Sequence, residues 1–201
     1  ILVLRPTVHC NQDCGFCSAN ESTPNVWADP AQMMRAIARA ARRGVNRVSF
    51  SGGEPTLARE LPSYIRVARR AGVPKVELVT NGVLLDRAPR VQALVDAGLT
   101  HAFVSLHGHD EASASLATRK RGDFARTVAA IGHLADAGVI TVINHVIHAG
   151  NAHLLTRFVE EVHARFAGRV MISFAFVTPQ YKALEHQEMV PRLTDVAPSL
   201  Q

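Results

Sequence analysis

The stretch "RRGVNRVSFSGGEP", residues 42–55, contains the signals that decide the fold. Gly44 follows a run with helical periodicity, and the apolar and β-branched residues of 47–51 come shortly after it. Glycine is common just past the end of a helix, and a short β-branched run is typical of a strand. A helix that leads through a glycine into a strand predicts one unit of an α/β sheet.

The same order of helix, glycine and strand recurs along the chain. Gly72, Gly98 and Gly138 each follow a run with helical periodicity and lead into the next predicted strand. The pattern therefore predicts six strands with helices between them. The predicted strands are residues 2–8, 47–51, 75–80, 101–106, 139–147 and 169–177, and the predicted helices are residues 30–43, 60–71, 87–97, 123–137 and 152–166.

This alternation sets the fold class. Strands that alternate with helices pair in parallel through right-handed crossovers, which gives a barrel or a doubly wound sheet. Evenly spaced units favour a barrel, but the usual eight-unit barrel needs about 250 residues, and this chain has 201. We therefore predict an α/β fold, an open six-stranded parallel (β/α)6 partial TIM barrel, over residues 1–180. Residues 181–201 are expected to be the start of a C-terminal extension that is cut short.

Composition narrows the possible partners. The net charge of +5 comes mostly from arginines spread along helical faces without interleaved aromatic residues, which favours solvated faces over a nucleic-acid surface. No apolar run approaches the roughly 20 residues that span a bilayer, so we expect no membrane segment. No signal peptide is visible, and the three cysteines lie too close together to brace the fold as disulfides. A reducing compartment, the cytoplasm, is the predicted location.

All three cysteines fall within "HCNQDCGFC", residues 9–17. A structural zinc ion or an iron–sulfur cluster normally takes four protein ligands. A C-x3-C-x2-C loop can instead supply three thiolates to a [4Fe–4S] cluster and leave the fourth iron open to a small molecule. Zinc with His9 as the fourth ligand and three free thiols are the alternatives. The side chain of His9 should point away from that of Cys10 on a strand, which disfavours zinc.

A second motif, "SGGEP" at residues 51–55, follows the strand after the cysteine loop. Gly52 and Gly53 at a strand end let the backbone approach a ligand closely, and Glu54 is suited to a cationic amine. A tight turn that ends in an acidic residue is the structural alternative. Because the carboxyl ends of barrel strands share one face, we expect this segment beside the cysteines.

The cysteine loop followed one unit later by "SGGEP" resembles the signature of the radical S-adenosylmethionine (radical SAM) superfamily. In that family three such cysteines, with an aromatic residue before the last, precede a GGEP-type segment. The resemblance covers essentially the whole chain and extends to "TNG" (80–82) and "SLHGHD" (105–110), which follow the third and fourth predicted strands. It implies that the chain is the core barrel domain of such an enzyme.

For single residues, the resemblance implies roles at the positions that match. Cys10, Cys14 and Cys17 would bind three irons of a [4Fe–4S] cluster. Phe16 would lie against the adenine of S-adenosylmethionine. The most specific part of the match is the combination of the cysteine loop with "SGGEP" at the end of the next predicted strand.

The resemblance also implies contacts to the rest of the nucleotide. Gly52, Gly53 and Glu54 would receive the methionyl ammonium. Four further residues lie at strand ends, and capping of the loops is their alternative role. Ser105 and His107 match positions that contact the ribose or the methionyl carboxylate, and Asn81 and Asn144 are placed for polar contacts.

The implied activity is radical chemistry. An external electron donor such as flavodoxin or ferredoxin would reduce the cluster, and S-adenosylmethionine would be cleaved to methionine and a 5′-deoxyadenosyl radical that takes a hydrogen atom from the substrate. The substrate is not identified; an open barrel mouth favours peptide or protein modification over a small metabolite. Two other classes remain: a zinc-dependent TIM-barrel hydrolase using His107, His109 and His145, and a non-catalytic iron–sulfur protein.

Overall fold

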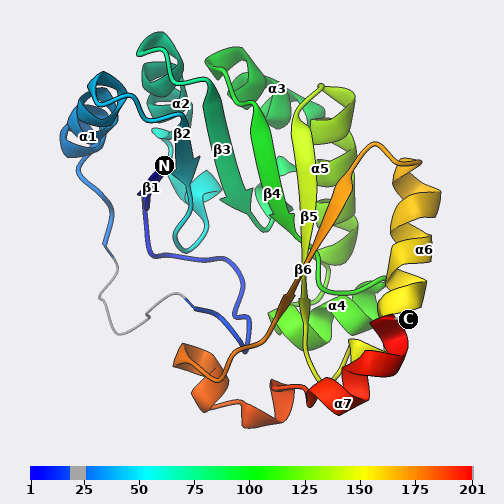
Figure 1. The fold of residues 1–201 in the computed structure, drawn as a ribbon. Helices are drawn as coiled ribbons and strands as arrows, with labels where there is room; N and C mark the ends of the chain where they lie inside the picture. The colour runs from blue at the N-terminus through cyan, green and yellow to red at the C-terminus, as the bar shows by residue number, and fades with distance from the viewer. Residues whose placement is uncertain (19–25, 201) are drawn as a thin grey trace.

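The computed structural model describes residues 1–18 and 26–200, which form one curved parallel sheet with helices on its outer face (Figure 1). The strands lie in the sheet in their order along the chain, β1-β2-β3-β4-β5-β6. In the described residues, β1 and β6 pair on one side only, so the sheet stays open. The predicted partial barrel is therefore confirmed. The strands are β1 Leu2–Leu4, β2 Arg47–Phe50, β3 Lys75–Thr80, β4 His101–Ser105, β5 Ile140–Ile147 and β6 Met171–Phe176.

The helices that return the chain between strands pack their apolar sides on the sheet. Ile37, Ile65 and Ile131, from three different helices, are completely buried in the main core. Each predicted helix is present with its ends displaced by at most three residues. These helices are α1 Pro30–Arg42, α2 Leu61–Arg70, α3 Ala88–Ala97, α5 Phe124–Asp136 and α6 Leu155–Phe166.

The first strand is shorter than predicted, because β1 ends at Leu4 and the prediction ran to residue 8. Pro6 lacks the N–H that a strand uses in its ladder. The chain then leaves the sheet, and Thr7 makes an isolated antiparallel bridge with Trp27. The early end of β1 leads the backbone into the cysteine loop.

One helix was not predicted, α4 over Glu111–Thr118. Its N-terminus is capped by Asp110, whose carboxylate accepts a hydrogen bond from Ser113 N at 2.8 Å, while Ser113 Oγ accepts one from Asp110 N at 3.3 Å. This helix lies beside the carboxyl ends of the strands in Figure 1. It is short, but it contacts the cysteine loop.

After β6 the chain passes below the strand ends in short helical turns (Figure 1). The division of the chain at residue 180 stays a prediction. None of the helices in residues 1–18 and 26–200 could span a bilayer. The helical turns are η4 Tyr181–Leu184, η5 Gln187–Met189, α7 Leu193–Val196 and η6 Ala197–Leu200.

Candidate functional site

The carboxyl ends of the strands surround a cavity of about 350 Å³. Every residue that the sequence singled out as a cluster or nucleotide ligand lines it. Further residues that were not predicted also line the cavity, and they come from the cysteine loop, from β3, β5 and β6, and from the segments that follow β2 and β6. The predicted lining residues are Cys10, Cys14, Phe16, Cys17, Gly52, Gly53, Glu54, Asn81, Ser105, His107 and Asn144; the additional ones are Gln12, Ser18, Ser51, Val79, Thr80, Val146, Phe176, Val177 and Thr178.

The three thiols are crowded into this cavity and form no disulfide. Burial, together with the neighbouring Cys17 and Cys10, raises the pKa of Cys14 to about 12. Burial also raises the pKa of Cys10. Iron favours the thiolate form, so a metal cluster would supply the positive charge that this set of sulfurs otherwise lacks.

The donor set fits a cluster better than a single ion. In the part of the chain that the structure describes, no three His, Cys, Asp or Glu side chains converge on one metal position. A cubane cluster binds its thiolates through separate irons, so the sulfurs need not converge. His9 does not line the cavity, and its ring lies 5.1 Å from that of Trp27. This position disfavours His9 as a zinc ligand.

The cysteine loop is fastened to the end of α4. Asp13 N donates to Thr118 O at 3.2 Å, and Gly15 N donates to Ala117 O at 3.2 Å. The last carbonyls of a helix have no partner within the helix, so they are available to a neighbouring segment. The unpredicted helix therefore positions the loop that carries the thiols.

The loop is also tied to the segment after β6. The Asp13 carboxylate lies 2.5 Å from Lys182 Nζ and 3.6 Å from Arg119 Nε. The hydrogen bond from Lys182 lowers the pKa of Asp13. The loop is thus held by chain segments more than a hundred residues away.

Gly52 and Gly53 let the cysteine loop approach β2. A Cβ on Gly52, whose φ is +131°, would lie 2.4 Å from Thr7 O, and one on Gly53 would lie 2.0 Å from His9 O. Gly53 N donates to Thr7 O at 3.1 Å, and Glu54 N donates to His9 O at 2.6 Å. The structure shows that the glycine pair admits the backbone of the cysteine loop, and its predicted contact with a ligand stays a prediction.

Glu54 is 1% exposed and forms the cavity wall with its carboxylate already hydrogen-bonded. The carboxylate accepts from Thr56 N and Oγ1 at 3.0 and 2.6 Å, from Thr80 Oγ1 at 2.6 Å, and from Asn81 N at 2.8 Å. Burial raises its pKa, and these hydrogen bonds oppose the rise. Glu54 therefore joins the ends of β2 and β3, and its contact with an ammonium group stays a prediction.

Phe16 is held by two buried histidines. Its ring centre lies 5.0 Å from that of His107, edge to face, and 6.2 Å from that of His148. His107 Nδ1 accepts a hydrogen bond from Val146 N at 3.1 Å, and burial lowers its pKa to about 3. The neutral imidazole thus carries its proton on Nε2 and serves as a fixed support for the aromatic ring.

Two of the histidines that a zinc hydrolase would use, His109 and His145, have their ring nitrogens in contact with other protein groups. His145 Nδ1 is 3.0 Å from Leu106 O, and its Nε2 is 3.1 Å from Asn151 Nδ2. His109 lies against Asp110 and Ser113, with Nε2 and Nδ1 each 3.3 Å from an oxygen. These contacts favour core histidines with satisfied hydrogen bonds over ligands of a hydrolytic zinc ion.

The buried histidines predict a pH dependence of stability. Burial lowers the pKa of His107 to about 3 and that of His145 to about 4, from an ordinary 6.5. Below pH 6.5 the unfolded chain takes up protons that the folded chain excludes, so stability should be complete above pH 6.5 and fall toward pH 4. The loss should reach roughly 1.4 kcal/mol per pH unit for each histidine. Urea unfolding of the metal-free protein at pH 7.5 and 5 would measure it; His145→Gln should reduce the slope, and a flat profile would contradict the assignment.

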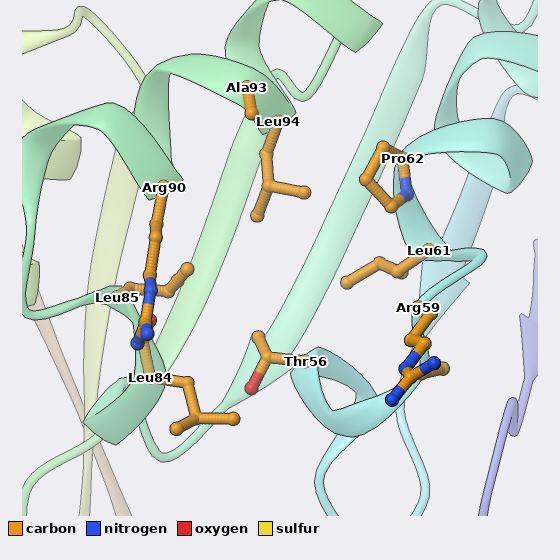
Figure 2. A pocket seen from close by; sticks show the side chains of 10 residues that line it. Thr56, Arg59, Leu61, Pro62, Leu84, Leu85, Arg90, Ala93 and Leu94 are labelled. Carbon is orange, nitrogen blue, oxygen red and sulfur yellow. The ribbon is translucent and has the colours of Figure 1, made fainter.

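A second cavity, of about 360 Å³, lies on the outer face between the N-terminal ends of α2 and α3. Figure 2 shows Arg59 and Arg90 on its opposite sides and leucines between them. None of the cysteines lines it. Thr56 lines this second cavity, and its hydroxyl donates a hydrogen bond to Glu54, which lines the cysteine cavity. The turn η1 (Pro55–Leu57) therefore lies between the two cavities.

Known proteins resemble this chain in sequence and in fold. The PqqA peptide cyclase of Gluconobacter oxydans is 34% identical over 174 residues, which are 86% of this chain and 48% of that protein. The GTP 3′,8-cyclase of Chlorobaculum tepidum is 35% identical over 138 residues, 68% of this chain and 41% of that protein. The chain thus spans about half the length of these relatives.

Among solved structures, Streptococcus suis SuiB has a similar fold. Its complex with the precursor peptide SuiA superimposes with a TM-score of 0.77 at 20% identity, over 99% of this chain and 44% of that one. A second SuiB structure, bound to S-adenosylmethionine, agrees equally well, with a TM-score of 0.77 at 22% identity.

The sequence profile of the Radical SAM superfamily matches residues 4–152, which include the cysteine loop and "SGGEP". This match covers most of the chain, and the two cyclases exceed 30% identity over at least two thirds of it. The chain belongs to the radical SAM superfamily.

Proposed function

We propose that the chain is the cluster-binding barrel of a radical SAM enzyme that modifies a peptide. Members of this family use a [4Fe–4S] cluster and S-adenosylmethionine. The observation that carries the proposal is the placement of the three thiols, the glycine pair and Phe16 in one cavity at the carboxyl ends of the strands. An electron donor such as flavodoxin or ferredoxin and a cytoplasmic location are part of the proposal.

Three thiolates, from Cys10, Cys14 and Cys17, would hold the cluster. When bound, the cluster and the nucleotide supply one-electron cleavage to methionine and a 5′-deoxyadenosyl radical, which removes a hydrogen atom from the substrate. The loop bonds from Asp13 and Gly15 to α4 fix the thiols before anything binds. Such preorganisation holds the reacting groups at a fixed distance from one another.

The other walls would orient the nucleotide. Phe16, supported by His107, offers an aromatic face to the adenine. Ser51, Gly52 and Gly53 line the cavity, and their backbone groups are suited to the methionyl end. Ser105 and Asn144 lie side by side on paired strands, which suits contacts to the ribose. Val79, Val146 and Val177 line the cavity with apolar side chains, which would limit the access of water to a reactive radical.

Relatives support a peptide substrate. The PqqA peptide cyclase matches 86% of this chain, and the GTP 3′,8-cyclase matches 68%. The fold agrees with that of SuiB, which was solved with a precursor peptide. We therefore propose a peptide, with a nucleotide such as GTP as the competing substrate class.

The test of the function is product analysis. The protein would be loaded with iron and sulfide without oxygen, reduced with dithionite and given S-adenosylmethionine; methionine and 5′-deoxyadenosine should appear in equal amounts. No cleavage would favour a non-catalytic iron–sulfur protein. A short peptide encoded beside this gene should increase 5′-deoxyadenosine formation. Stimulation by GTP and not by the peptide would overturn the substrate class.

The position of Phe16 predicts that its loss weakens nucleotide binding without affecting the cluster. Phe16→Ala should weaken S-adenosylmethionine binding by about tenfold, because aromatic stacking on a base contributes about 1–3 kcal/mol, and it should leave iron content intact. Calorimetric titration of the cluster-loaded protein measures the affinity. Phe174→Ala is the matched control, since Phe174 packs against His145 and Phe158 and does not line the cavity. Loss of iron in Phe16→Ala would show that Phe16 supports the cluster instead.

A further inference from the structure

Asn81 follows β3 at its carboxyl end and is 7% exposed. Its backbone N–H donates to Glu54 Oε2 at 2.8 Å, and its backbone C=O accepts from Thr127 Oγ1 at 2.9 Å. Both main-chain groups are therefore fixed to neighbouring elements. The side chain projects from a rigid point on the cavity wall.

The side-chain amide has one orientation that satisfies its neighbours. Asn81 Oδ1 accepts from Val83 N at 3.0 Å, which requires the oxygen on that side. Asn81 Nδ2 then faces the cysteine loop and donates to Asn11 Oδ1 at 2.7 Å, with Cys10 Sγ at 3.9 Å. Both of these contacts of the amide nitrogen are with the cysteine loop.

Cys10 Sγ receives a second donor from the backbone. Gln12 N lies 3.4 Å from the sulfur. Hydrogen bonds to the thiolate sulfurs of an iron–sulfur cluster are among the features that set its reduction potential. Reduction adds negative charge that spreads onto the sulfurs, so a donor stabilises the reduced form and raises the potential.

We propose that Asn81 is a positioning residue that directs an N–H group at the Cys10 thiolate and thereby raises the reduction potential of the cluster. This inference rests on the proposed function, because it requires the cluster. It replaces the predicted contact between Asn81 and the nucleotide with a role on the sulfur. Through Glu54 it also links the "SGGEP" segment to the cluster loop.

The test is a redox titration of the cluster-loaded protein, followed by electron paramagnetic resonance without any nucleotide. Asn81→Ala should lower the midpoint potential, so that the ratio of reduced to oxidised cluster at a fixed potential falls roughly tenfold, about 59 mV for a one-electron couple. Asn81→Asp keeps the acceptor for Val83 N, loses the donor and adds a negative charge near Cys10. Both changes disfavour the reduced cluster, so the aspartate variant should lower the potential by more than the alanine variant does.

Two controls separate this role from simple packing. Asn144→Ala changes an amide that lines the same cavity. Asn11→Ala removes the acceptor of Asn81, an oxygen that also lies 4.0 Å from Cys10 Sγ, but leaves the donor from Asn81 to Cys10 in place. Neither should lower the potential.

Unchanged potentials in loaded Asn81→Ala and Asn81→Asp would overturn the inference, even if iron content fell. That result would leave the proposed function standing. A wild-type protein that takes up no cluster would overturn the proposed function and this inference with it.

Discussion

Cys14→Ala should abolish the cluster. Cys14 lines the cavity together with Cys10 and Cys17, and the sequence has no fourth cysteine that could replace it. Two remaining thiolates would leave two irons without protein ligands. We expect iron and sulfide content after anaerobic loading to fall by more than tenfold, together with the visible absorption of the cluster.

A control substitution on the same loop distinguishes the loss of an iron ligand from a general disturbance of the loop. Ser18→Ala alters the residue next to Cys17, which also lines the cavity, and should retain full iron content. The fold of Cys14→Ala should survive, because the main core contains no cysteine. Full iron content and normal cleavage of S-adenosylmethionine in Cys14→Ala would refute the assignment of the ligands.

Gly53→Ala should have the second large effect. The new methyl group would lie 2.0 Å from His9 O and 2.4 Å from Val8 O, and backbone atoms cannot move aside as a flexible side chain can. Glu54 N holds His9 O at 2.6 Å, so the cysteine loop must detach from β2 to make room. We expect a loss of about 3 kcal/mol of stability, at the upper end for overpacking, and poor cluster retention. Urea unfolding and iron analysis measure the two effects.

Gly132→Ala is the control for this substitution. Gly132 lies in α5, and a Cβ there meets no atom within 4 Å. The change should be neutral or stabilise the protein by about 0.5–1 kcal/mol, because alanine is the better helix former. Equal stability of the Gly53 and Gly132 variants would contradict the close approach of loop and strand.

The fold was predictable because its signals are local. Each unit carries its own helix end and strand, and Gly98 takes the left-handed conformation expected after α3, with φ at 109°. The cavity was predictable for a related reason: parallel strands bring their carboxyl ends to one face, so residues far apart in sequence meet there.

Features that depend on tertiary contacts could not be predicted. The stretch "EASASLAT" of α4 has no strong apolar periodicity, and only Asp110 and Ser113 at its start signal a helix. The hydrogen bonds from Lys182 to Asp13 and from Asn81 to Asn11 join distant segments, and no sequence pattern indicates either residue pair. Pro6 was the available signal for the early end of β1.

Three cysteines would leave one iron of the cluster open to S-adenosylmethionine. The most direct measurement is the electron paramagnetic resonance spectrum of the reduced, cluster-loaded protein before and after the nucleotide is added at low temperature. If one iron is open, adding S-adenosylmethionine should change the spectrum, and adding buffer alone should leave the spectrum unchanged. A reduced cluster whose spectrum is the same with and without S-adenosylmethionine would contradict an iron that is open to the nucleotide.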